Sequence, residues 1–200
     1  IRAAVLAFVV GLGAVIFSSI RKPEVAQAPG PADKSAAVAQ ALRWLKSAQE
    51  QSGEWDASKW GARKEHNVGV SALALMAFTQ NNKAGDPGNA PVVSKGIDYL
   101  VSRQNADGMF GPSCSASLYN HGMATLALLE RYSADRKNEK LRGAAERAIK
   151  FTLGSQGRQD VSSWGYLSAG VDSANSSATV WQLQSLLLAD SRGFEGLKPG

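Results

Sequence analysis

Few side chains in this sequence are able to do chemistry, and two of them are histidines in similar surroundings. His66 and His121 each lie just before a segment rich in Ala and Leu, and each has an asparagine beside it, Asn67 and Asn120. Asp172 stands before a third segment of this kind. Polar side chains at the start of a helix usually cap it or occupy its first turn. The spacing therefore predicts helix starts at these residues.

The sequence gives little support for a metal site or a disulfide bond. Cys114 is the single cysteine, which excludes an internal disulfide framework and a zinc site with several cysteines. Asp107, Cys114 and His121 follow one another at intervals of seven residues, so a tetrahedral zinc site is a minor alternative. The favoured interpretation of Cys114 is a small loop or interior residue. We predict neither a metal nor a cofactor.

The composition is that of a globular protein. Of the 200 residues, 44% are hydrophobic and 20% are charged, which excludes a wholly disordered or fibrous chain. The net charge of +5 arises from 22 basic and 17 acidic residues scattered along the sequence. Scattered charge makes no dedicated nucleic-acid surface, so we expect no nucleic-acid partner, although weak attraction to anionic lipid is compatible with it.

An uncharged apolar run lies near the start of the chain. Ala3–Ile20 contains 18 residues and would extend about 27 Å as a helix, close to the hydrocarbon thickness of a bilayer. Arg2 flanks the run on one side, and Arg21 and Lys22 flank it on the other. We predict a transmembrane anchor over residues 1–22 and therefore a single-pass membrane protein.

Two alternatives stay open for this run: a buried core helix, and a signal peptide cleaved at the small-x-small sequence Ala26–Ala28. Basic residues on both sides leave the orientation open, with the extracytoplasmic side slightly favoured for the domain that follows. Residues 23–34 contain three prolines and predict a semi-extended linker. The domain is expected over residues 35–200, and we expect it to be incomplete at its C-terminal end.

One pattern recurs three times with a period near 54 residues, which indicates a repeat architecture. It consists of an amphipathic segment, a glutamine, one or more glycines and an aromatic residue. The glutamines and aromatic residues of the three copies are Gln49 with Trp55, Gln104 with Phe110, and Gln156 with Trp164. A glutamine at a helix end can satisfy free backbone groups, a glycine permits the reversal, and the aromatic ring covers the junction. We predict that these residues are structural.

Each copy is followed by an apolar segment rich in Ala and Leu, so each repeat is predicted to be a helical hairpin. No segment has the pattern of a strand, and the predicted fold is all-α. The six helices are expected at about 35–49, 66–80, 92–104, 119–134, 139–154 and 174–190. Trp44, Tyr99 and Phe151 occupy the same place in the three copies and are predicted to pack in the core.

These segments resemble a known family. ALRWLKSAQEQSGEW, residues 41–55, is similar to the QW repeat of squalene-hopene and other triterpene cyclases, and residues 96–111 and 148–166 look like degenerate copies. Protein prenyltransferase β subunits belong to the same superfamily. Residues 118–132 and 176–190 also resemble bacterial squalene-cyclase-like repeat proteins, many of which are membrane-anchored. The resemblance extends over about residues 35–190.

The resemblance implies an α/α-toroid, either a barrel or an open arc, of which about three hairpins are present. The signature helices would form an outer ring, and the Ala/Leu-rich helices an inner ring around a cavity. In the family the N-termini of the inner helices surround one mouth of that cavity. This implies a second role, as a polar rim facing a ligand, for His66, Asn67, Asn120, His121 and Asp172. Trp181 would line the cavity wall, where an aromatic face can stabilise a cation.

The chemistry of the family transfers less well than its fold. Hopene-type cyclases protonate their substrate with an Asp-x-Asp-Asp motif, and the 200 residues contain none. The even spacing of Asp107, Cys114 and His121 does not match the zinc ligands of protein prenyltransferases. The favoured function is therefore a membrane-anchored binding or scaffold module with an apolar or isoprenoid ligand or a protein partner. The alternatives are a fragment of an isoprenoid-processing enzyme, and another enzyme using His121 with Tyr119.

Overall fold

The structure is a computed structural model that describes residues 31–81, 88–156, 163–166 and 174–194. It divides into two units, Ile1–Ala39 and Gln40–Gly200, and the second contains the whole arrangement discussed below. The predicted anchor, residues 1–22, lies outside the described residues. Within the described ranges, no helix has the length and apolar character needed to span a bilayer.

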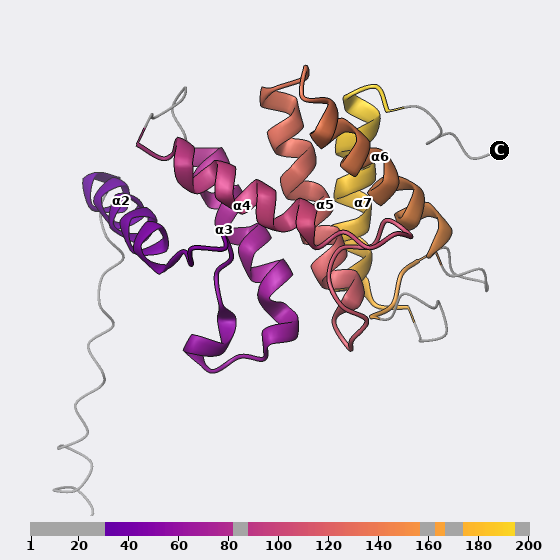
Figure 1. Cartoon of the computed structure of the whole chain (residues 1–200), viewed down its shortest axis with the longest axis horizontal. Coiled ribbons are helices and arrows are strands. Elements are labelled where there is room, and N and C mark those ends of the chain that lie inside the picture. Colours follow the sequence, from indigo (N-terminus) through magenta and orange to yellow (C-terminus); the bar gives the residue numbers. More distant parts are fainter. Residues whose placement is uncertain (1–30, 82–87, 157–162, 167–173, 195–200) are drawn as a thin grey trace, which may run out of the picture. The chain divides into compact units, whose positions relative to one another are not determined.

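The described part of the chain is all-helical, as the sequence predicts, and its one backbone bridge is the isolated pair Gln104–Phe110. Two short 3-10 helices, η1 (Ala57–Trp60) and η2 (Lys64–His66), lie in the first loop. The α-helices, shown in Figure 1, are α2 (Pro31–Ala48), α3 (Asn67–Asn81), α4 (Ala90–Ser102), α5 (Ser117–Ala134), α6 (Glu139–Gly154) and α7 (Ser176–Ser191).

Helix ends follow from local chemistry, and the helix starts differ from the sequence expectation by up to four residues. The first helix begins at Pro31, so the last four residues of the predicted linker are helical; proline is tolerated in the first turn, where its missing N–H has no intrahelical partner. α5 begins at Ser117, two residues earlier than expected. An asparagine caps the start of α6, where Asn138 accepts a hydrogen bond from the Leu141 N–H at 3.1 Å.

The helices of the second unit form two layers (Figure 1). α3, α5 and α7 pack side by side in one layer, the inner row, while α4 packs on α3 and α6 packs on α5. Glycines allow the inner helices to approach closely. A Cβ atom on Gly69 would lie 2.8 Å from Oδ1 of Asn120, and one on Gly122 would lie 2.6 Å from Nε2 of Gln182. The inner row is thus held by close backbone approach as well as by apolar burial.

The glutamines of the first two copies make the same pair of hydrogen bonds. Gln49 Nε2 donates to the carbonyl oxygen of Gly53 at 3.1 Å, and to that of Val92 in α4 at 2.9 Å. Gln104 Nε2 donates to the carbonyl oxygen of Gly108 at 3.1 Å, and to that of Ala144 in α6 at 2.9 Å. Each glutamine therefore fastens its own loop to the next outer helix. We call these two sets the glutamine clamps.

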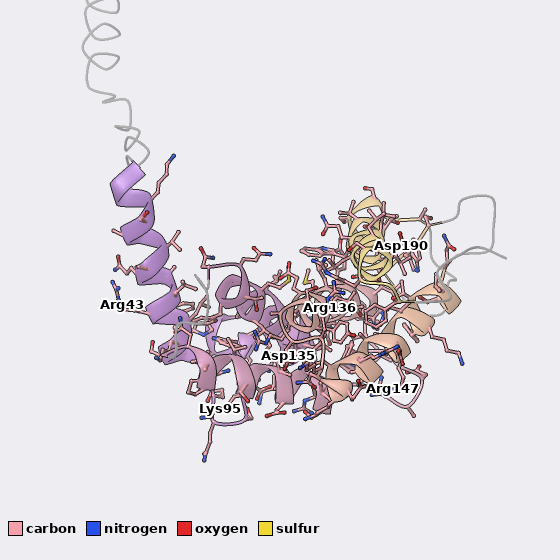
Figure 2. The ribbon with its side chains drawn as sticks, turned by 90° about the horizontal axis from the view of Figure 1, so that it is seen from above. Arg43, Lys95, Asp135, Arg136, Arg147 and Asp190 are labelled. Atoms are coloured by element: carbon pink, nitrogen blue, oxygen red, sulfur yellow. The ribbon has the colours of Figure 1, made fainter. Side chains whose placement is uncertain are left out.

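The glycine of each clamp packs directly on the outer helix that the glutamine contacts. Gly53 has φ +91° and Gly108 has φ +98°, and both values favour glycine. A Cβ atom on Gly53 would lie 2.2 Å from the carbonyl oxygen of Lys95 in α4. On Gly108 it would lie 2.4 Å from that of Arg147 in α6; Figure 2 labels both helix residues. The glycines therefore provide close contact in addition to the chain reversal.

The signature tryptophans also bond in the same way. Trp55 Nε1 donates to the carbonyl oxygen of Leu45 at 2.7 Å, and Trp164 Nε1 donates to that of Thr152 at 2.9 Å. Leu45 and Thr152 occupy the same place in their copies. Phe110, the aromatic residue of the second copy, is fully buried without such a donor. Gln156 follows the end of α6, and residues 157–162 beyond it lie outside the described ranges.

Candidate functional site

Of the predicted rim residues that the structure describes, Asn120 bonds to the segment that holds His66 and Asn67, while His121 is buried in the core. His66 ends η2 and is half-buried, and Asn67 begins α3. Asn120 and His121 lie inside α5, because that helix begins at Ser117 and not near Tyr119. Asp172 lies outside the described residues.

His121 is a core residue, which corrects the prediction of a rim position and of a helix start. Its side chain is 0% exposed and packs between the rings of Phe110 and Phe151. Nδ1 accepts the backbone N–H of Phe110 at 3.2 Å, so the proton is assigned to Nε2, which donates to Oγ1 of Thr152 at 2.9 Å. Burial lowers the pKa of His121 to about 3, so the ring is neutral at physiological pH.

The role of His121 recurs with other side chains in the other hairpins. The backbone N–H of Trp55 donates to Oγ of Ser71 in α3 at 2.9 Å, and that of Trp164 donates to Oγ1 of Thr179 in α7 at 3.1 Å. In all three hairpins a polar side chain near the start of the inner helix accepts the N–H of the signature aromatic residue. His121 is therefore the acceptor of the second hairpin, a role that the sequence pattern did not reveal.

The two asparagines also bond to backbone groups. Asn120 Oδ1 accepts the N–H of Gly69 at 3.1 Å, and Asn120 Nδ2 donates to the carbonyl oxygen of Glu65 at 2.7 Å. Asn120 thus caps the first turn of the neighbouring helix α3. Asn67 Oδ1 accepts the N–H of Ala57 at 3.0 Å. The amide groups of both residues are occupied in joining segments of the fold.

Trp181 lies on α7 where that helix meets α5. Its Cβ atom is 2.8 Å from the place that a Cβ on Gly122 would occupy, and its ring is only partly buried. The tryptophan is therefore placed against the inner row, and its role in lining a cavity stays a prediction. Cys114 is half-buried in the turn before α5, where its Sγ accepts the N–H of Ala116 at 3.4 Å. Across the described ranges, no three His, Cys, Asp or Glu side chains come together as a metal site.

A polar cavity of about 510 Å³ lies where the first hairpin meets the second. It opens at the start of α3 and the end of α4, and we call it the polar cavity. Its charged and hydrogen-bonding side chains include Glu54, Lys64, Asn67, Tyr99, Ser102 and Arg103. Of the predicted rim residues, only Asn67 lines it. The sequence analysis assigned Tyr99 to the core and gave Arg103 no role, and the packing of α4 on α3 brings both to this cavity.

Tyr99 determines what the polar cavity can do chemically. Burial raises the pKa of its phenol, and the negative charge of Glu54 raises it further. The guanidinium of Arg103 lies over the Tyr99 ring, 5.1 Å from its centroid, as a cation–π contact. The phenol therefore keeps its proton at neutral pH, where it can donate a hydrogen bond but cannot act as a base. Lys64 and Arg103 add positive charge, so the cavity suits a ligand with an anionic or hydrogen-bond-accepting group.

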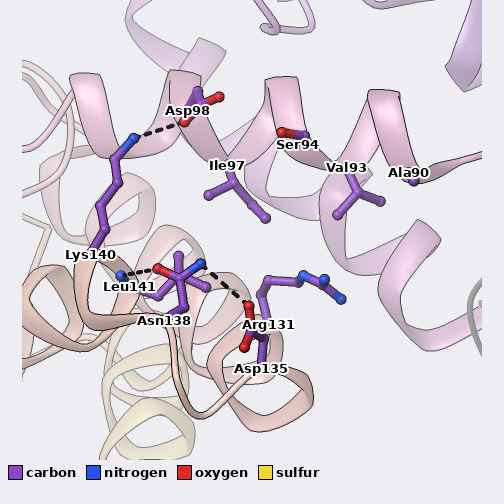
Figure 3. Close-up of a pocket in the computed structure, with 10 residues that line it drawn as sticks. All are labelled: Ala90, Val93, Ser94, Ile97, Asp98, Arg131, Asp135, Asn138, Lys140 and Leu141. Atoms are coloured by element: carbon purple, nitrogen blue, oxygen red, sulfur yellow. Dashed lines mark hydrogen bonds and ion pairs between the residues drawn. The ribbon is translucent and has the colours of Figure 1, made fainter.

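A second cavity, of about 400 Å³, lies near the other end of α4, between it, the end of α5 and the start of α6 (Figure 3). Val93 and Ile97 form part of its apolar wall. Lys140 pairs with Asp98 across one edge at 2.8 Å. Both members of that pair are exposed, so the pair adds little to stability. The cavity contains none of the predicted site residues.

These features define a class of protein: an α-helical hairpin repeat in which inner helices stack in a row and glutamine clamps join the outer ones. The model of the squalene-hopene cyclase C-terminal domain family matches residues 21–127, more than half of the chain. The protein belongs to this family, which confirms the resemblance found in the sequence. The matched range includes the first glutamine clamp, and Gln104 with its loop from the second.

Proposed function

We propose that this protein is a binding or scaffold module, held at a membrane by residues 1–22, whose hairpins form part of an α/α-toroid. One observation supports the proposal more than any other. The side chains expected to form a reactive rim, Asn67, Asn120 and His121, all spend their polar groups on joining neighbouring segments. Polar groups bonded in this way stabilise the fold. The charged groups that can contact a ligand line the polar cavity.

The polar cavity favours a ligand with an anionic head. Lys64 and Arg103 can pair with such a head, whereas the protonated phenol of Tyr99 already donates a hydrogen bond to Glu54. Prenyl diphosphates carry this kind of head together with the apolar tail expected of an isoprenoid ligand. The two glutamine clamps support the QW-repeat interpretation, because they make matching bonds in consecutive hairpins.

A second candidate function is isoprenoid processing, which family membership favours. The full chain, purified with its N-terminal segment, would be incubated with farnesyl diphosphate and separately with squalene. Binding would be followed by calorimetry and products by mass spectrometry. Saturable binding without a product is the result expected for a binding module, whereas a cyclised or transferred product would replace the proposal with an enzyme.

A pair of arginine variants locates the binding. Arg103→Ala should weaken farnesyl diphosphate binding about tenfold, since a charge-assisted contact contributes on the order of 1.5 kcal/mol. Arg136→Ala, in the exposed turn after α5, should leave it unchanged. Equal effects of the two variants would refute the polar cavity as the binding site. Extraction of the membrane fraction with alkaline carbonate should release the chain only when residues 1–22 are deleted.

A further inference from the structure

The second cavity, of about 400 Å³, has an aliphatic wall. Helix α4 contributes Val93 and Ile97 to this wall, and α6 contributes Leu141 (Figure 3). Val93 and Ile97 are four residues apart, so they lie on the same side of α4. Cavities of this size and with such a lining are typical of sites for small organic molecules. The cavity can therefore accept an aliphatic group.

Two opposite charges border the same cavity and do not pair with each other. Arg131 lies in the last turn of α5 and Asp135 directly follows that helix. The N–H of Asp135 donates to the carbonyl oxygen of Arg131 at 3.2 Å, which keeps the two residues one helical turn apart. Oppositely charged side chains at this spacing often form an ion pair. Here the Arg131 side chain is directed away from Asp135, towards the side of the cavity where Val93 lies (Figure 3).

Both charges are available to a ligand. Among the described residues, the half-buried guanidinium of Arg131 has no ion pair or hydrogen bond. Asp135 Oδ2 accepts Nδ2 of Asn138 at 3.5 Å, the outer limit of a hydrogen bond, and its Oδ1 has no partner within the same ranges. The remaining charges of the cavity, Lys140 and Asp98, already pair with each other. One positive and one negative group are thus left beside an aliphatic wall.

We propose that the second cavity binds a free α-amino acid with an aliphatic side chain, such as leucine. The ligand carboxylate pairs with the planar guanidinium of Arg131, and the ligand ammonium group pairs with the carboxylate of Asp135. Both ligand groups are attached to one carbon atom, so they can reach protein charges that lie one helical turn apart. The aliphatic side chain contacts Val93 and Ile97. An anion without the ammonium group would be repelled by Asp135.

This site is separate from the polar cavity. The two cavities share no lining residue, and they lie towards opposite ends of α4, with Val93 and Ile97 at one and Tyr99 and Arg103 at the other. The polar cavity has two cations beside one carboxylate, whereas the second cavity has one unpaired charge of each sign. The proposal for the second cavity therefore does not depend on what the polar cavity binds.

The first test compares leucine with molecules that each lack one of its features. The full chain, purified with its N-terminal segment, would be titrated by isothermal calorimetry. Leucine should bind saturably with a dissociation constant on the order of 0.1 mM. Isocaproate lacks the ammonium group, isoamylamine lacks the carboxylate and free glycine lacks the side chain, so each should bind about tenfold more weakly or less. Phosphocholine, whose charges lie farther apart as in a lipid headgroup, should also bind more weakly than leucine.

Two of these comparisons can overturn the proposal. No saturable binding of leucine up to about 10 mM would refute the site. Equal affinities for leucine and isocaproate would show a simple anion site, in which the carboxylate of Asp135 has no role. Tighter binding of phosphocholine than of leucine would assign the cavity to a lipid headgroup instead.

Charge-removing variants then locate the binding. Arg131→Gln and Asp135→Asn should each weaken leucine binding about tenfold, because each removes one charged contact. The matched controls are Arg136→Gln and Asp190→Asn, which change exposed residues outside the cavity and should keep the wild-type affinity. Asp135→Asn should not weaken isocaproate binding, since it removes a repelling carboxylate, whereas a loss of structure would weaken both ligands. Equal losses for both ligands, or for the controls, would overturn the assignment of these two residues.

Discussion

The two end helices of the inner row, α3 and α7, differ in how their outward sides are treated. The rear side of α3 carries Asn67, Ser71 and Phe78, and all three are buried although no inner helix precedes them among the described residues. The first loop covers them: Trp55 bonds to Ser71 through its N–H, and its ring lies 6.2 Å from that of Phe78. Among the described residues, no segment covers Val180, Leu183 and Leu187 of α7 in this way, and all three are exposed.

This difference shows how a repeat protein closes one end of its core. Each inner helix relies on a neighbour to bury its flanks, so the terminal helices need either a cap or a partner. At α3 the chain supplies the cap itself, with Trp55 and Ala57 bonded to side chains of the helix. At α7 the described residues present branched aliphatic side chains to solvent. Among the described residues, the first loop therefore covers Asn67, Ser71 and Phe78 of α3, although Val70 and Leu73 of that helix stay exposed, whereas Val180, Leu183 and Leu187 of α7 are the more exposed set.

The largest effect should come from removing the buried ring at the capped end. Phe78→Ala should lower the free energy of unfolding by about 3–5 kcal/mol, since it leaves a cavity beneath Trp55. Leu187→Ala, at an exposed position of α7, should lower it by less than about 0.5 kcal/mol. Urea titrations of both variants measure this. Similar losses would mean that the two ends are equally packed, against the comparison above.

The cap also depends on a glycine. Gly53→Ala should cost about 3 kcal/mol, because the new methyl group meets the backbone of α4 at Lys95 and the positive φ is strained as well. Gly61→Ala is the matched control: Gly61 has φ +86°, and nothing lies within 4 Å of its Cβ position. It should cost about 1 kcal/mol from backbone strain alone. If the two variants melt at the same temperature, the close contact with α4 contributes nothing.

Much of this fold is predictable from the sequence, because helix period, glycine and the signature residues are local signals. All six helices lie within four residues of their expected starts, and the first two glutamines make the predicted kind of bond. The prediction that Trp44 packs in the core was wrong, because its side chain is 48% exposed. Tyr99, at the same place in the second copy, is buried as predicted. The sequence of one repeat does not show which other segment of the chain packs against its helices.

The site was harder to predict than the fold, for a related reason. His121 was expected at a helix start, but α5 begins earlier, and the N–H of Leu118 bonds to the carbonyl oxygen of Tyr166 from the loop before α7. That long-range contact moves His121 into the core. The polar cavity combines Glu54 with Tyr99 and Arg103. Glu54 is distant in sequence from the other two, and no sequence motif links it to them. Only the packing of one hairpin on the next brings them together.

The buried imidazole in the middle of the row should make stability depend on pH. The pKa of His121 is about 3 in the folded state and near 6.5 when the chain is unfolded, so the unfolded state binds more protons between these values. The stabilisation is complete above pH 6.5 and is lost as the pH falls towards 3. Between pH 6.5 and 5, we expect a loss of about 2 kcal/mol in the free energy of unfolding, measured by urea titration.

Two variants assign that pH dependence to one ring. His121→Asn keeps an acceptor for the N–H of Phe110 and removes the titrating group, so the loss between pH 6.5 and 5 should shrink by about 2 kcal/mol. His66→Asn changes a half-buried side chain outside the core and should keep the wild-type profile. An unchanged profile in His121→Asn would show that carboxyl groups, and not the imidazole, govern acid unfolding in this range.

The smallest expected difference concerns the amides that join the inner helices. Asn120 has both its amide atoms bonded, whereas Gln182 donates to the carbonyl oxygen of Leu118 at 2.6 Å and its buried Oε1 has no hydrogen-bond partner among the described residues. Asn120→Leu should lower the free energy of unfolding by about 2 kcal/mol, because it leaves the N–H of Gly69 without the acceptor that Asn120 provides. Gln182→Met should cost less than about 1 kcal/mol, since it removes an unpaired acceptor together with the donor. Thermal unfolding ranks the two variants. A larger loss for Gln182→Met would show that α7 is fixed to the row more firmly than α3 is, and the comparison of the two ends would then have to rest on solvent exposure alone.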